Sequence, residues 1–425
     1  MTKLVIIGLG AAGFAAALSA RKVDRSIDIT IIDSKDYDLM HPCGLPFAID
    51  GEVKLEELKH KINSEAMKLK LINKSKVTDI DTKDKTLTYQ KGNQENTLTY
   101  DKLIIATGSS PIKPKIEGIE DNDNLFTIHT PEDVRKLITT TKKIKKANII
   151  GAGAIGLETA IALNNKDVEV TITEALSSIL PKSLDKDISE IIENSLKEKK
   201  IKLNLNKKID KINKDEITIL ATGVSSNKNL AEKANIKLGK FGIKVNEKLE
   251  TSVKDVYAVG DCIETINLIT KKPWPSLIAS SAYKQGTIAG ANAAGSSQSY
   301  SGTLTTFATV LDKIEIASTG LNSHFAKKEG FDIISAKAKS KSKPEWFPNN
   351  KEITLKIIVD KKTKKILGAQ AVGDKAAEKI NLISAAISSN QTIQDLSNVE
   401  LAYCPAVSQT YDIITMVADL ILRRL

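Results

Sequence analysis

The chain has 425 residues, of which 41% are hydrophobic and 27% are charged, and this composition is typical of a folded protein rather than a disordered one. Its length exceeds what one hydrophobic core supports and predicts about three domains. The net charge of +10 is carried mostly by lysine, and only 4% of the residues are aromatic. Proteins that read nucleic acid rely on arginine forks and aromatic platforms. The composition therefore disfavours a nucleic-acid partner and fits an anionic small molecule or plain solubility.

The cysteines are few and widely separated. Cys43, Cys262 and Cys404 show neither CxxC spacing nor a zinc-ligand pattern, so no metal site is predicted. So few cysteines in so long a chain indicate a reducing compartment. Met1 leads directly into an apolar segment without a signal-peptide layout, and no apolar run reaches the length of a membrane span. We therefore expect a cytoplasmic protein with no membrane partner.

The first glycine motif lies between a predicted strand and a predicted helix. The apolar strand Leu4–Ile7 leads into Gly8-Leu-Gly-Ala-Ala-Gly13, and an alanine-rich helix follows over Phe14–Ala20. The first glycine permits the tight turn, the second lets the backbone approach a pyrophosphate, and the third lets helix and strand pack closely. The next strand, Ile27–Ile32, ends in Asp33, where the ribose of a dinucleotide would bind. Together these features predict a dinucleotide site.

The same pattern returns in the middle of the chain. The strand Ala147–Ile150 leads into Gly151-Ala-Gly-Ala-Ile-Gly156, a helix follows over Leu157–Leu163, and the strand Val168–Thr173 ends in Glu174. Two complete fingerprints predict two bound dinucleotides. An acid in this position would accept a hydrogen bond from a ribose 2′-hydroxyl and repel a 2′-phosphate, which favours NADH over NADPH.

Three further apolar strands end in short glycine motifs. They are Ala106-Thr-Gly108, Ala221-Thr-Gly223 and Gly260-Asp-Cys262. A glycine at a strand end lets a ligand come close, and Asp261 could hold a sugar-alcohol chain. Each motif alone could be an ordinary strand end, so their order along the chain carries the information.

Cys43 lies in the stretch His41-Pro-Cys-Gly-Leu-Pro46, which follows the first strand–helix–strand unit. A cysteine in this loop can act as a redox thiolate beside a flavin, although a lone cysteine is also often a buried structural residue. A helix that began just after Cys43 would favour the thiolate through its dipole. His41 could stabilise that thiolate, but a role in the turn is the preferred interpretation.

In this order, the two glycine fingerprints, the lone cysteine, the two Ala-Thr-Gly motifs and the Gly-Asp motif resemble the flavin-dependent pyridine nucleotide–disulfide oxidoreductases. The similarity covers essentially the whole chain and is greatest to the single-cysteine branch, which comprises coenzyme A disulfide reductases, NADH oxidases and NADH peroxidases. It implies an α/β fold with two Rossmann-like dinucleotide-binding domains and an α+β C-terminal dimerisation domain. The implied domains are an FAD domain over 1–112 and 240–300, an NAD(P)H domain over 113–239 and a dimerisation domain over 301–425.

The resemblance also assigns the cofactor contacts. It implies that FAD meets the first fingerprint, the acid after it and the strand-end motifs: Gly8, Gly10, Ala11, Ala12, Gly13, Asp33, Val77, Ala106, Thr107, Gly108, Asp261 and Ala279. It implies that NAD(P)H meets the corresponding residues of the second half: Gly151, Gly153, Ile155, Gly156, Glu174 and Gly223. Glu158 resembles the family glutamate near the nicotinamide.

The peroxidases and similar oxidases carry a histidine where this chain has Ala11, so the chain is more similar to the coenzyme A disulfide reductases. The implied reaction uses NADH, FAD and Cys43 to reduce a small disulfide such as that of coenzyme A, with coenzyme A as substrate or bound thiol. Tyr403 matches a family tyrosine that reaches the other subunit's cysteine in a homodimer whose active site is shared across the interface. Cys404 stands where alanine is common, and it is either a resolving thiol or a small buried residue.

Two alternatives stay open at this point. One is a flavin NADH oxidase that reduces oxygen, and the other is a flavoprotein electron-transfer component in which Cys43 is structural. The remaining pattern concerns the C-terminal third. It predicts strands within Leu304–Leu321, Glu352–Asp360 and Lys365–Val372, helices over Ala376–Ser389 and Thr410–Leu422, and an exposed loop over Ala336–Pro348.

Overall fold

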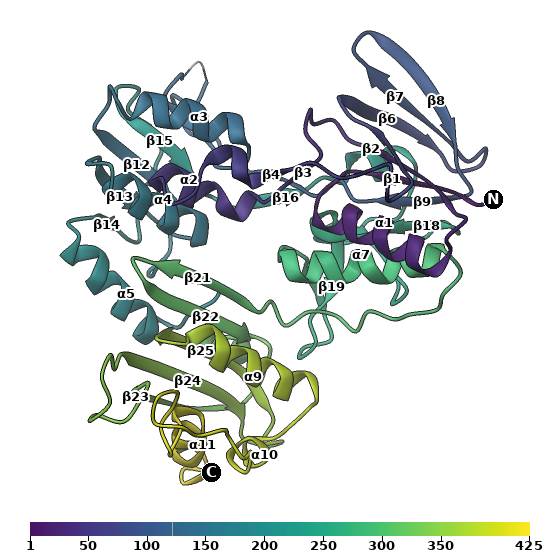
Figure 1. Cartoon of the computed structure of the whole chain (residues 1–425). Coiled ribbons are helices and arrows are strands. Elements are labelled where there is room, and N and C mark those ends of the chain that lie inside the picture. Colours follow the sequence, from purple (N-terminus) through teal and green to yellow (C-terminus); the bar gives the residue numbers. More distant parts are fainter. Residues whose placement is uncertain (121) are drawn as a thin grey trace. The chain divides into compact units, whose positions relative to one another are not determined.

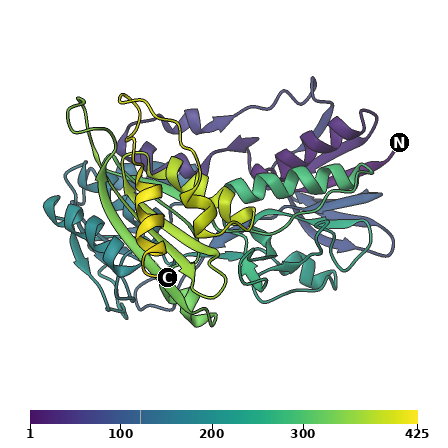
Figure 2. The ribbon, with the colours of Figure 1, turned by 90° about the horizontal axis from the view of Figure 1, so that it is seen from below.

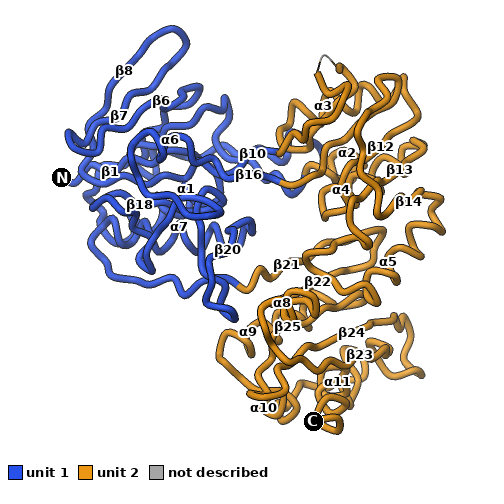
Figure 3. The backbone as a smooth tube through the Cα atoms, turned by 180° about the vertical axis from the view of Figure 1, so that it is seen from behind, with its two compact units in different colours: residues 1–44, 54–111, 224–303 blue, residues 45–53, 112–223, 304–425 orange. Residues whose placement is uncertain are grey.

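The structure is a computed structural model, and it describes residues 1–120 and 122–425. The chain forms two compact units (Figure 3). The first contains residues 1–44, 54–111 and 224–303, and the second contains residues 45–53, 112–223 and 304–425. Within the described residues, none of the helices combines the length and the apolar character that crossing a membrane requires. The three-domain division predicted from the sequence stays a proposal.

A parallel five-stranded sheet forms the centre of the first unit, in the order β18-β9-β1-β2-β5 (Figure 1). Its strands are β1 (Lys3–Ile7), β2 (Asp28–Ile32), β5 (Leu69–Ile72), β9 (Lys102–Ile105) and β18 (Val256–Ala258). The strands at its centre are apolar and almost fully buried, as expected for a parallel sheet whose faces are covered. The expected strand before each glycine motif or acid is therefore present.

Two helices of the first unit, α1 (Ala11–Val23) and α7 (Ala279–Ala293), pack side by side (Figures 1 and 2). Small residues make this close packing possible. A Cβ atom added at Gly286 would lie 2.1 Å from the carbonyl oxygen of Ala12, and one added at Gly290 would lie 2.1 Å from that of Ala16. The helix that carries the first glycine turn is thus held directly against α7.

Smaller elements complete the first unit. An antiparallel sheet contains β6 (Ser75–Asp81), β7 (Thr86–Lys91) and β8 (Gln94–Thr99), and a second small sheet contains β17 (Ile243–Lys244), β19 (Ile263–Ile266) and β20 (Pro273–Pro275). Two-stranded ladders join β3 (Leu39–Met40) to β4 (Lys59–His60) and β10 (Ser109–Pro111) to β16 (Val224–Ser226). The unit also contains α6 (Asn229–Lys233) and three short 3₁₀ turns at Pro42–Gly44, Leu55–Leu58 and Gly260–Cys262.

The second unit begins with another parallel sheet, in the order β11-β15-β12-β13-β14. Its strands are β11 (Leu125–Phe126), β12 (Lys146–Ile150), β13 (Glu169–Thr173), β14 (Lys202–Asn204) and β15 (Ile217–Leu220). The helices of this region are α2 (Leu45–Asp50), α3 (Pro131–Thr140), α4 (Ala154–Asn164) and α5 (Lys186–Glu198). Two Rossmann-like sheets in one chain confirm the α/β prediction for this part of the fold.

An antiparallel sheet in the order β21-β22-β25-β24-β23 forms the C-terminal part of the second unit. Its strands are β21 (Phe307–Leu311), β22 (Ile314–Gly320), β23 (Ile333–Lys341), β24 (Glu352–Asp360) and β25 (Ile366–Gly373). The helices are α8 (Ser323–Lys328), α9 (Ala376–Ser388), α10 (Ile393–Ser397) and α11 (Ile413–Leu422). This antiparallel sheet, together with its helices, confirms the α+β prediction.

The expected loop over Ala336–Pro348 is wrong in its first half, because β23 continues to Lys341. Ala336 is buried, whereas Lys337 and Lys339 are exposed two residues apart. Such alternation is typical of an edge strand that places lysines on its solvent side, where they discourage pairing with other chains. The lysine content suggested a loop, although it belongs to the exposed face of a strand.

Candidate functional site

Cys43 is exposed and lies in the first unit, in a short 3₁₀ turn at Pro42–Gly44. The backbone N–H of His41 donates to the carbonyl of Leu58, and the N–H of Gly44 donates to the carbonyl of His41, both over 3.0 Å. A Cβ atom at Gly44 would lie 2.3 Å from a Leu58 methyl group, so the turn closes tightly on Leu58. Helix α2 begins at the residue after this turn, Leu45. The thiol is therefore presented by an ordered turn.

A basic and aromatic cluster lies near this turn. The rings of His41 and His60 meet edge to face with their centroids 4.8 Å apart, and the β3–β4 ladder brings their two segments together. The ammonium group of Lys59 lies 5.2 Å from the centre of the Tyr37 ring. The sequence indicated a turn role for His41, and the structure adds His60 as its ring partner.

In the first glycine turn, each glycine meets a different steric demand. Gly8 has a φ of +104°, and a Cβ atom there would lie 2.3 Å from the carbonyl oxygen of Ala106, the first residue of the first Ala-Thr-Gly motif. A Cβ atom at Gly13 would lie 2.0 Å from the carbonyl oxygen of Gly8. Beside Gly10 there is open space, with no atom within 4 Å of an added Cβ. The turn thus keeps a clear approach at its middle glycine.

The second glycine turn repeats this geometry. Gly151 has a φ of +107°, and a Cβ atom there would lie 2.3 Å from the carbonyl oxygen of Ala221, the first residue of the second Ala-Thr-Gly motif. A Cβ atom at Gly156 would lie 2.2 Å from the carbonyl oxygen of Gly151, and Gly153 again has open space beside it. The close approach between the first glycine and the alanine explains why the two motifs recur together.

The two acids that follow the glycine turns are held in the same way. The backbone N–H of Leu9 donates to Asp33 over 2.5 Å, and that of Ala152 donates to Glu174 over 2.8 Å. In each case the N–H two residues after the acid donates to the other carboxylate oxygen. Asp33 also forms an ion pair with Lys35 at 3.0 Å. These contacts fix each carboxylate and leave lone pairs that can accept from ribose hydroxyls.

The Gly-Asp motif at Gly260-Asp261 packs against the first glycine turn. A Cβ atom added at Gly260 would lie 3.1 Å from the Cβ of Ala12. The hydroxyl of Ser109 donates to the carboxylate of Asp261 over 2.9 Å. Burial raises the pKa of Asp261, and this hydrogen bond opposes that shift by stabilising the charged form. Asp261 is therefore a half-buried acceptor that follows β18, the edge strand of the first sheet.

The threonines of the two Ala-Thr-Gly motifs hold the ends of the β10–β16 ribbon. The hydroxyl of Thr107 donates to the carbonyl of Asn227 over 2.8 Å, and that of Thr222 donates to the carbonyl of Ile112 over the same distance. The amide of Asn227 donates back to the carbonyl of Thr107. These threonines therefore stabilise the crossing strands in addition to any contact with a ligand.

Other predicted residues occupy varied positions. Val77 is half-buried on β6, Ala279 is exposed at the start of α7, and Ile155 is exposed in the second glycine turn. Cys262 is fully buried, and its thiol contacts the carbonyl oxygens of Val259 and Ile105. Cys262 is therefore part of the hydrophobic core of the first unit.

Glu158 lies on α4, is half-buried and follows the last glycine of the second glycine motif by two residues. The hydroxyl of Thr309, on β21, donates to its carboxylate over 2.5 Å. Burial raises the pKa of Glu158, and the hydrogen bond from Thr309 works in the opposite direction. No local pattern predicts this role of Thr309, because the contact joins residues 151 positions apart in the chain.

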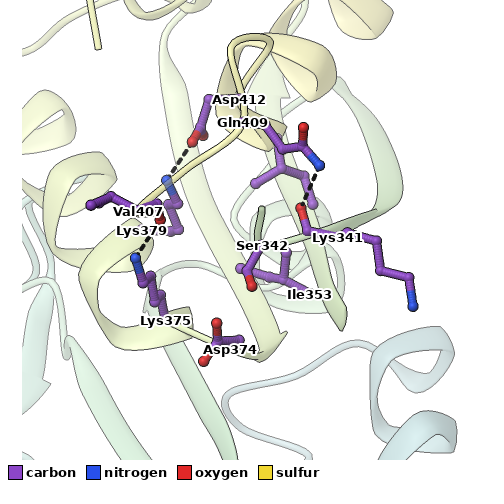
Figure 4. A pocket seen from close by; sticks show the side chains of 10 residues that line it. Lys341, Ser342, Ile353, Asp374, Lys375, Lys379, Val407, Gln409 and Asp412 are labelled. Atoms are coloured by element: carbon purple, nitrogen blue, oxygen red, sulfur yellow. Dashed lines mark hydrogen bonds and ion pairs between the residues drawn. The ribbon is translucent and has the colours of Figure 1, made fainter. Parts of the chain in front are cut away.

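Tyr403 and Cys404 are both exposed, in the segment between α10 and α11. The carbonyl of Cys404 accepts from the backbone N–H groups of Val407 and Ser408. A small pocket borders the end of this segment, where Lys375 donates to the carbonyl of Val407 and Lys379 pairs with Asp412 (Figure 4). Cys404 is exposed in the single chain, and both interpretations of it, a resolving thiol and a small buried residue, stay predictions.

The residues of both glycine turns fit a dinucleotide. The first N–H groups of a helix have no intrahelical acceptor, and neither α1 nor α4 has a side-chain cap, because glycine occupies each N-cap. Open space beside Gly10 and Gly153 gives an anionic group access to these donors. The fixed carboxylates of Asp33 and Glu174 would supply acceptors for ribose hydroxyls. The fit holds independently in each unit.

Some residues of this region were missed by sequence reasoning. Ser109 directly follows the first Ala-Thr-Gly motif, so its neighbourhood could have been inferred from that position. Asn227 and Thr309 carry no local signal, because their contacts depend on segments distant in the sequence.

Comparison with known proteins agrees with this geometry. Residues 2–286 match the model of the pyridine nucleotide-disulphide oxidoreductase family, and residues 306–412 match that of its dimerisation domain. An NADH oxidase of Methanocaldococcus jannaschii is 34% identical over 451 residues, covering 100% of this chain and 99% of that protein. A CoA-dependent NAD(P)H sulfur oxidoreductase of Pyrococcus furiosus is 33% identical and covers 98% of both chains.

A solved structure is similarly close. That of an NAD-dependent persulfide reductase from A. fulgidus superposes with a TM-score of 0.96 at 33% identity, covering 99% of this chain and 83% of that one. Both the sequence comparison and the superposition span the two glycine turns, the cysteine turn and the C-terminal sheet. The chain belongs to the pyridine nucleotide-disulphide oxidoreductase family, whose members depend on FAD and NAD(P)H.

Proposed function

We propose that the protein is an FAD-dependent NADH oxidoreductase that reduces a low-molecular-weight disulfide or polysulfide through Cys43. The observation that carries this proposal is the exposed thiol of Cys43 in an ordered turn at the start of α2. A relative that is matched over 98% of its length is named a CoA-dependent NAD(P)H sulfur oxidoreductase, and a solved structure that is matched over 83% of its chain is named an NAD-dependent persulfide reductase. Coenzyme A disulfide, or a persulfide or polysulfide of similar size, is the substrate class that follows.

The proposed chemistry begins at the sulfur atom of Cys43. Its thiolate attacks one sulfur of the substrate disulfide, forms a mixed disulfide and releases the other half as a thiolate. Two electrons and one proton then cleave the mixed disulfide, which restores the Cys43 thiolate and releases the second half as a thiol. FAD, when bound, would supply this electron pair, which it would take from NADH. Tyr403 of the partner subunit is the proposed proton donor to the departing thiolate.

Nucleotide binding follows from the two glycine turns. The N–H groups at the start of α1 would hold the pyrophosphate of FAD, with Asp33 on its ribose and Asp261 on its ribityl chain. Those at the start of α4 would hold the pyrophosphate of NADH, with Glu174 on its ribose. Because the carboxylate of Glu174 is fixed by two backbone N–H groups, a 2′-phosphate would meet a negative charge that cannot turn away, and NADH is favoured over NADPH.

A second candidate function is the reduction of oxygen. The relative from Methanocaldococcus jannaschii is named an NADH oxidase, and this observation supports the alternative. Ala11 stands where the peroxidases and similar oxidases carry a histidine, and it offers no acid or base for oxygen chemistry. Disulfide reduction therefore remains the favoured proposal. A homodimer in the cytoplasm, with a small molecule as substrate, completes it.

Replacing Cys43 by alanine tests the proposal. Cys43→Ala should lower the rate of disulfide- and polysulfide-dependent NADH oxidation by about a hundred-fold or more, because the nucleophile is removed. NADH should still bleach the bound flavin of this variant. Cys404→Ala is the matched control, because this residue is the other exposed cysteine. Full turnover in Cys404→Ala would exclude Cys404 as a resolving thiol. Undiminished disulfide turnover in Cys43→Ala would overturn the proposal and favour the electron-transfer alternative.

A further inference from the structure

The hydrogen bond between Thr309 and Glu158 connects two parts of the second unit, one within residues 2–286 and the other within the dimerisation domain of residues 306–412. Glu158 belongs to α4, which begins at the second glycine turn, and Thr309 belongs to β21, the first strand of the C-terminal sheet. Thr309 is 6% exposed, and its backbone pairs with Ile316 of β22. The hydroxyl is therefore fixed by a sheet rather than by a mobile loop.

We propose that Thr309 is a positioning residue for the nicotinamide half of the reaction, because its hydroxyl donates to the Glu158 carboxylate and holds it in one orientation. This inference rests on the proposed function and on the resemblance to the family, which implies that Glu158 lies near the nicotinamide. The nicotinamide ring becomes cationic when its hydride leaves, and a fixed carboxylate nearby stabilises that charge. The C-terminal sheet thus contributes to hydride transfer as well as to dimer formation.

The physical basis is the balance between burial and hydrogen bonding at Glu158. Burial raises the pKa of this carboxyl, and Thr309 is the hydrogen-bond donor that opposes the shift. The charged groups of the elements that pack against α4 lie away from Glu158. Strand β21 has no charged residue, and Asp50 of α2 accepts a hydrogen bond from Asn165, at the C-terminal end of α4. Lys146 and Glu169 are the first residues of β12 and β13. Since these strands end at the glycine turn and the acid, their first residues lie at the opposite edge of the sheet. The hydrogen bond from the Thr309 hydroxyl is thus the nearby interaction that favours the charged form of Glu158.

The test uses variants of the FAD-loaded enzyme that remove or keep the hydroxyl of Thr309, and a control variant at a neighbouring threonine. Thr309→Val keeps the shape and removes the donor, whereas Thr309→Ser keeps the donor. Thr159→Val is the matched control: Thr159 follows Glu158 on α4, is fully buried, and its hydroxyl has no partner among the described residues. Thermal unfolding of each variant shows whether the fold is retained.

The first readout is nucleotide affinity, measured by calorimetry on the oxidised enzyme without turnover. Thr309→Val should weaken binding of NAD⁺, whose ring is cationic, about ten-fold, and should leave the affinity for the neutral tetrahydro analogue of NADH unchanged. Thr309→Ser and Thr159→Val should match the wild type with both nucleotides. A merely structural role of Thr309 would weaken both ligands equally, and that result would overturn the inference.

The second readout is the rate at which NADH bleaches the flavin under anaerobic conditions. Thr309→Val should slow it about ten-fold in the wild type but have no effect in a Glu158→Ala background, because the residue acts through Glu158. An equal loss in both backgrounds would contradict the inference. If NADH bleaches the flavin of Glu158→Ala at the wild-type rate, the inference is wrong. The proposed function is tested separately, by NADH-dependent disulfide turnover of the wild-type enzyme.

Discussion

At the scale of single residues, the glycine turns separate folding from ligand binding. Gly8 and Gly13 have carbonyl oxygens where a Cβ atom would lie, whereas Gly10 and Gly153 have open space there. Two kinds of glycine therefore exist in each turn. One kind is required by the protein's own packing, and the other keeps a space that the fold itself does not fill.

Alanine at the two open positions should affect the two cofactors separately. Gly10→Ala should fold with the stability of the wild-type apoprotein but purify with little FAD, because the added methyl group occupies the approach to the helix N-terminus. Gly153→Ala should keep its full FAD content and bind NADH about ten-fold or more weakly. Flavin absorbance per chain and NADH titration measure the two effects. Loss of FAD in Gly153→Ala would contradict the assignment of the two sites.

At the scale of elements, a charge cluster connects parts of the first unit. Lys102 on β9 and Lys85, just before β7, both pair with Asp255, just before β18. Burial raises the pKa of Asp255, but the hydrogen bonds from Lys102 and Lys85 outweigh it and lower the pKa below its usual value. A carboxyl group with a depressed pKa stabilises the folded state above its unfolded-state pKa, and this contribution disappears as pH falls through the folded-state pKa.

Asp255→Asn should therefore destabilise the protein by about 1–2 kcal/mol at pH 7. Its difference from the wild type should shrink as the pH falls below about 4, because the wild-type carboxyl also becomes protonated there. Asn also tolerates the φ of +68° at this position. Denaturant unfolding at both pH values measures the effect, with the exposed Asp84→Asn as control. A difference that is constant with pH would show that the ion pairs contribute nothing.

A second charge cluster connects the elements of the second unit. Lys356 on β24 is buried and pairs with Asp185 at 2.8 Å and with Asp187 at 2.7 Å, at the start of α5. Lys356→Met should destabilise the protein by about 3 kcal/mol, because it leaves a buried carboxylate without its cation. Lys337→Met, which removes the more exposed partner of Asp187, should change stability by less than about 1 kcal/mol. Similar stabilities of the two variants in denaturant would contradict this difference.

The sequence was most informative where function and backbone geometry coincide. Both glycine turns, the acids after them and the strands before them are readable locally, because each depends on a few adjacent residues. The extension of β23 to Lys341 was not, because alternating lysines on an edge strand resemble a polar loop. The contact between Thr309 and Glu158 could not be predicted either, since it depends on how a distant sheet packs on α4.

At the scale of the whole molecule, the match of residues 306–412 to a dimerisation domain supports a homodimer of twice 46.1 kDa. The proposed active site combines Cys43 of one subunit with Tyr403 of the partner subunit. Mixing the subunits of two inactive variants, Cys43→Ser and Tyr403→Phe, should then restore about a quarter of the wild-type rate, because half of the dimers contain one intact site. A purification tag on only one of the two variants, with which the untagged variant must co-purify, confirms the mixing, and no recovery would place both residues within one subunit.

The central claim is that Cys43 exchanges electrons with a small disulfide by way of the flavin. Anaerobic titration of the purified protein with NADH, followed by its visible spectrum and by mass spectrometry of Cys43, tests it most directly. The account predicts release of a small thiol from Cys43 and a long-wavelength band from its thiolate beside the oxidised flavin. Simple bleaching of the flavin, with Cys43 unmodified and unreactive, would contradict it.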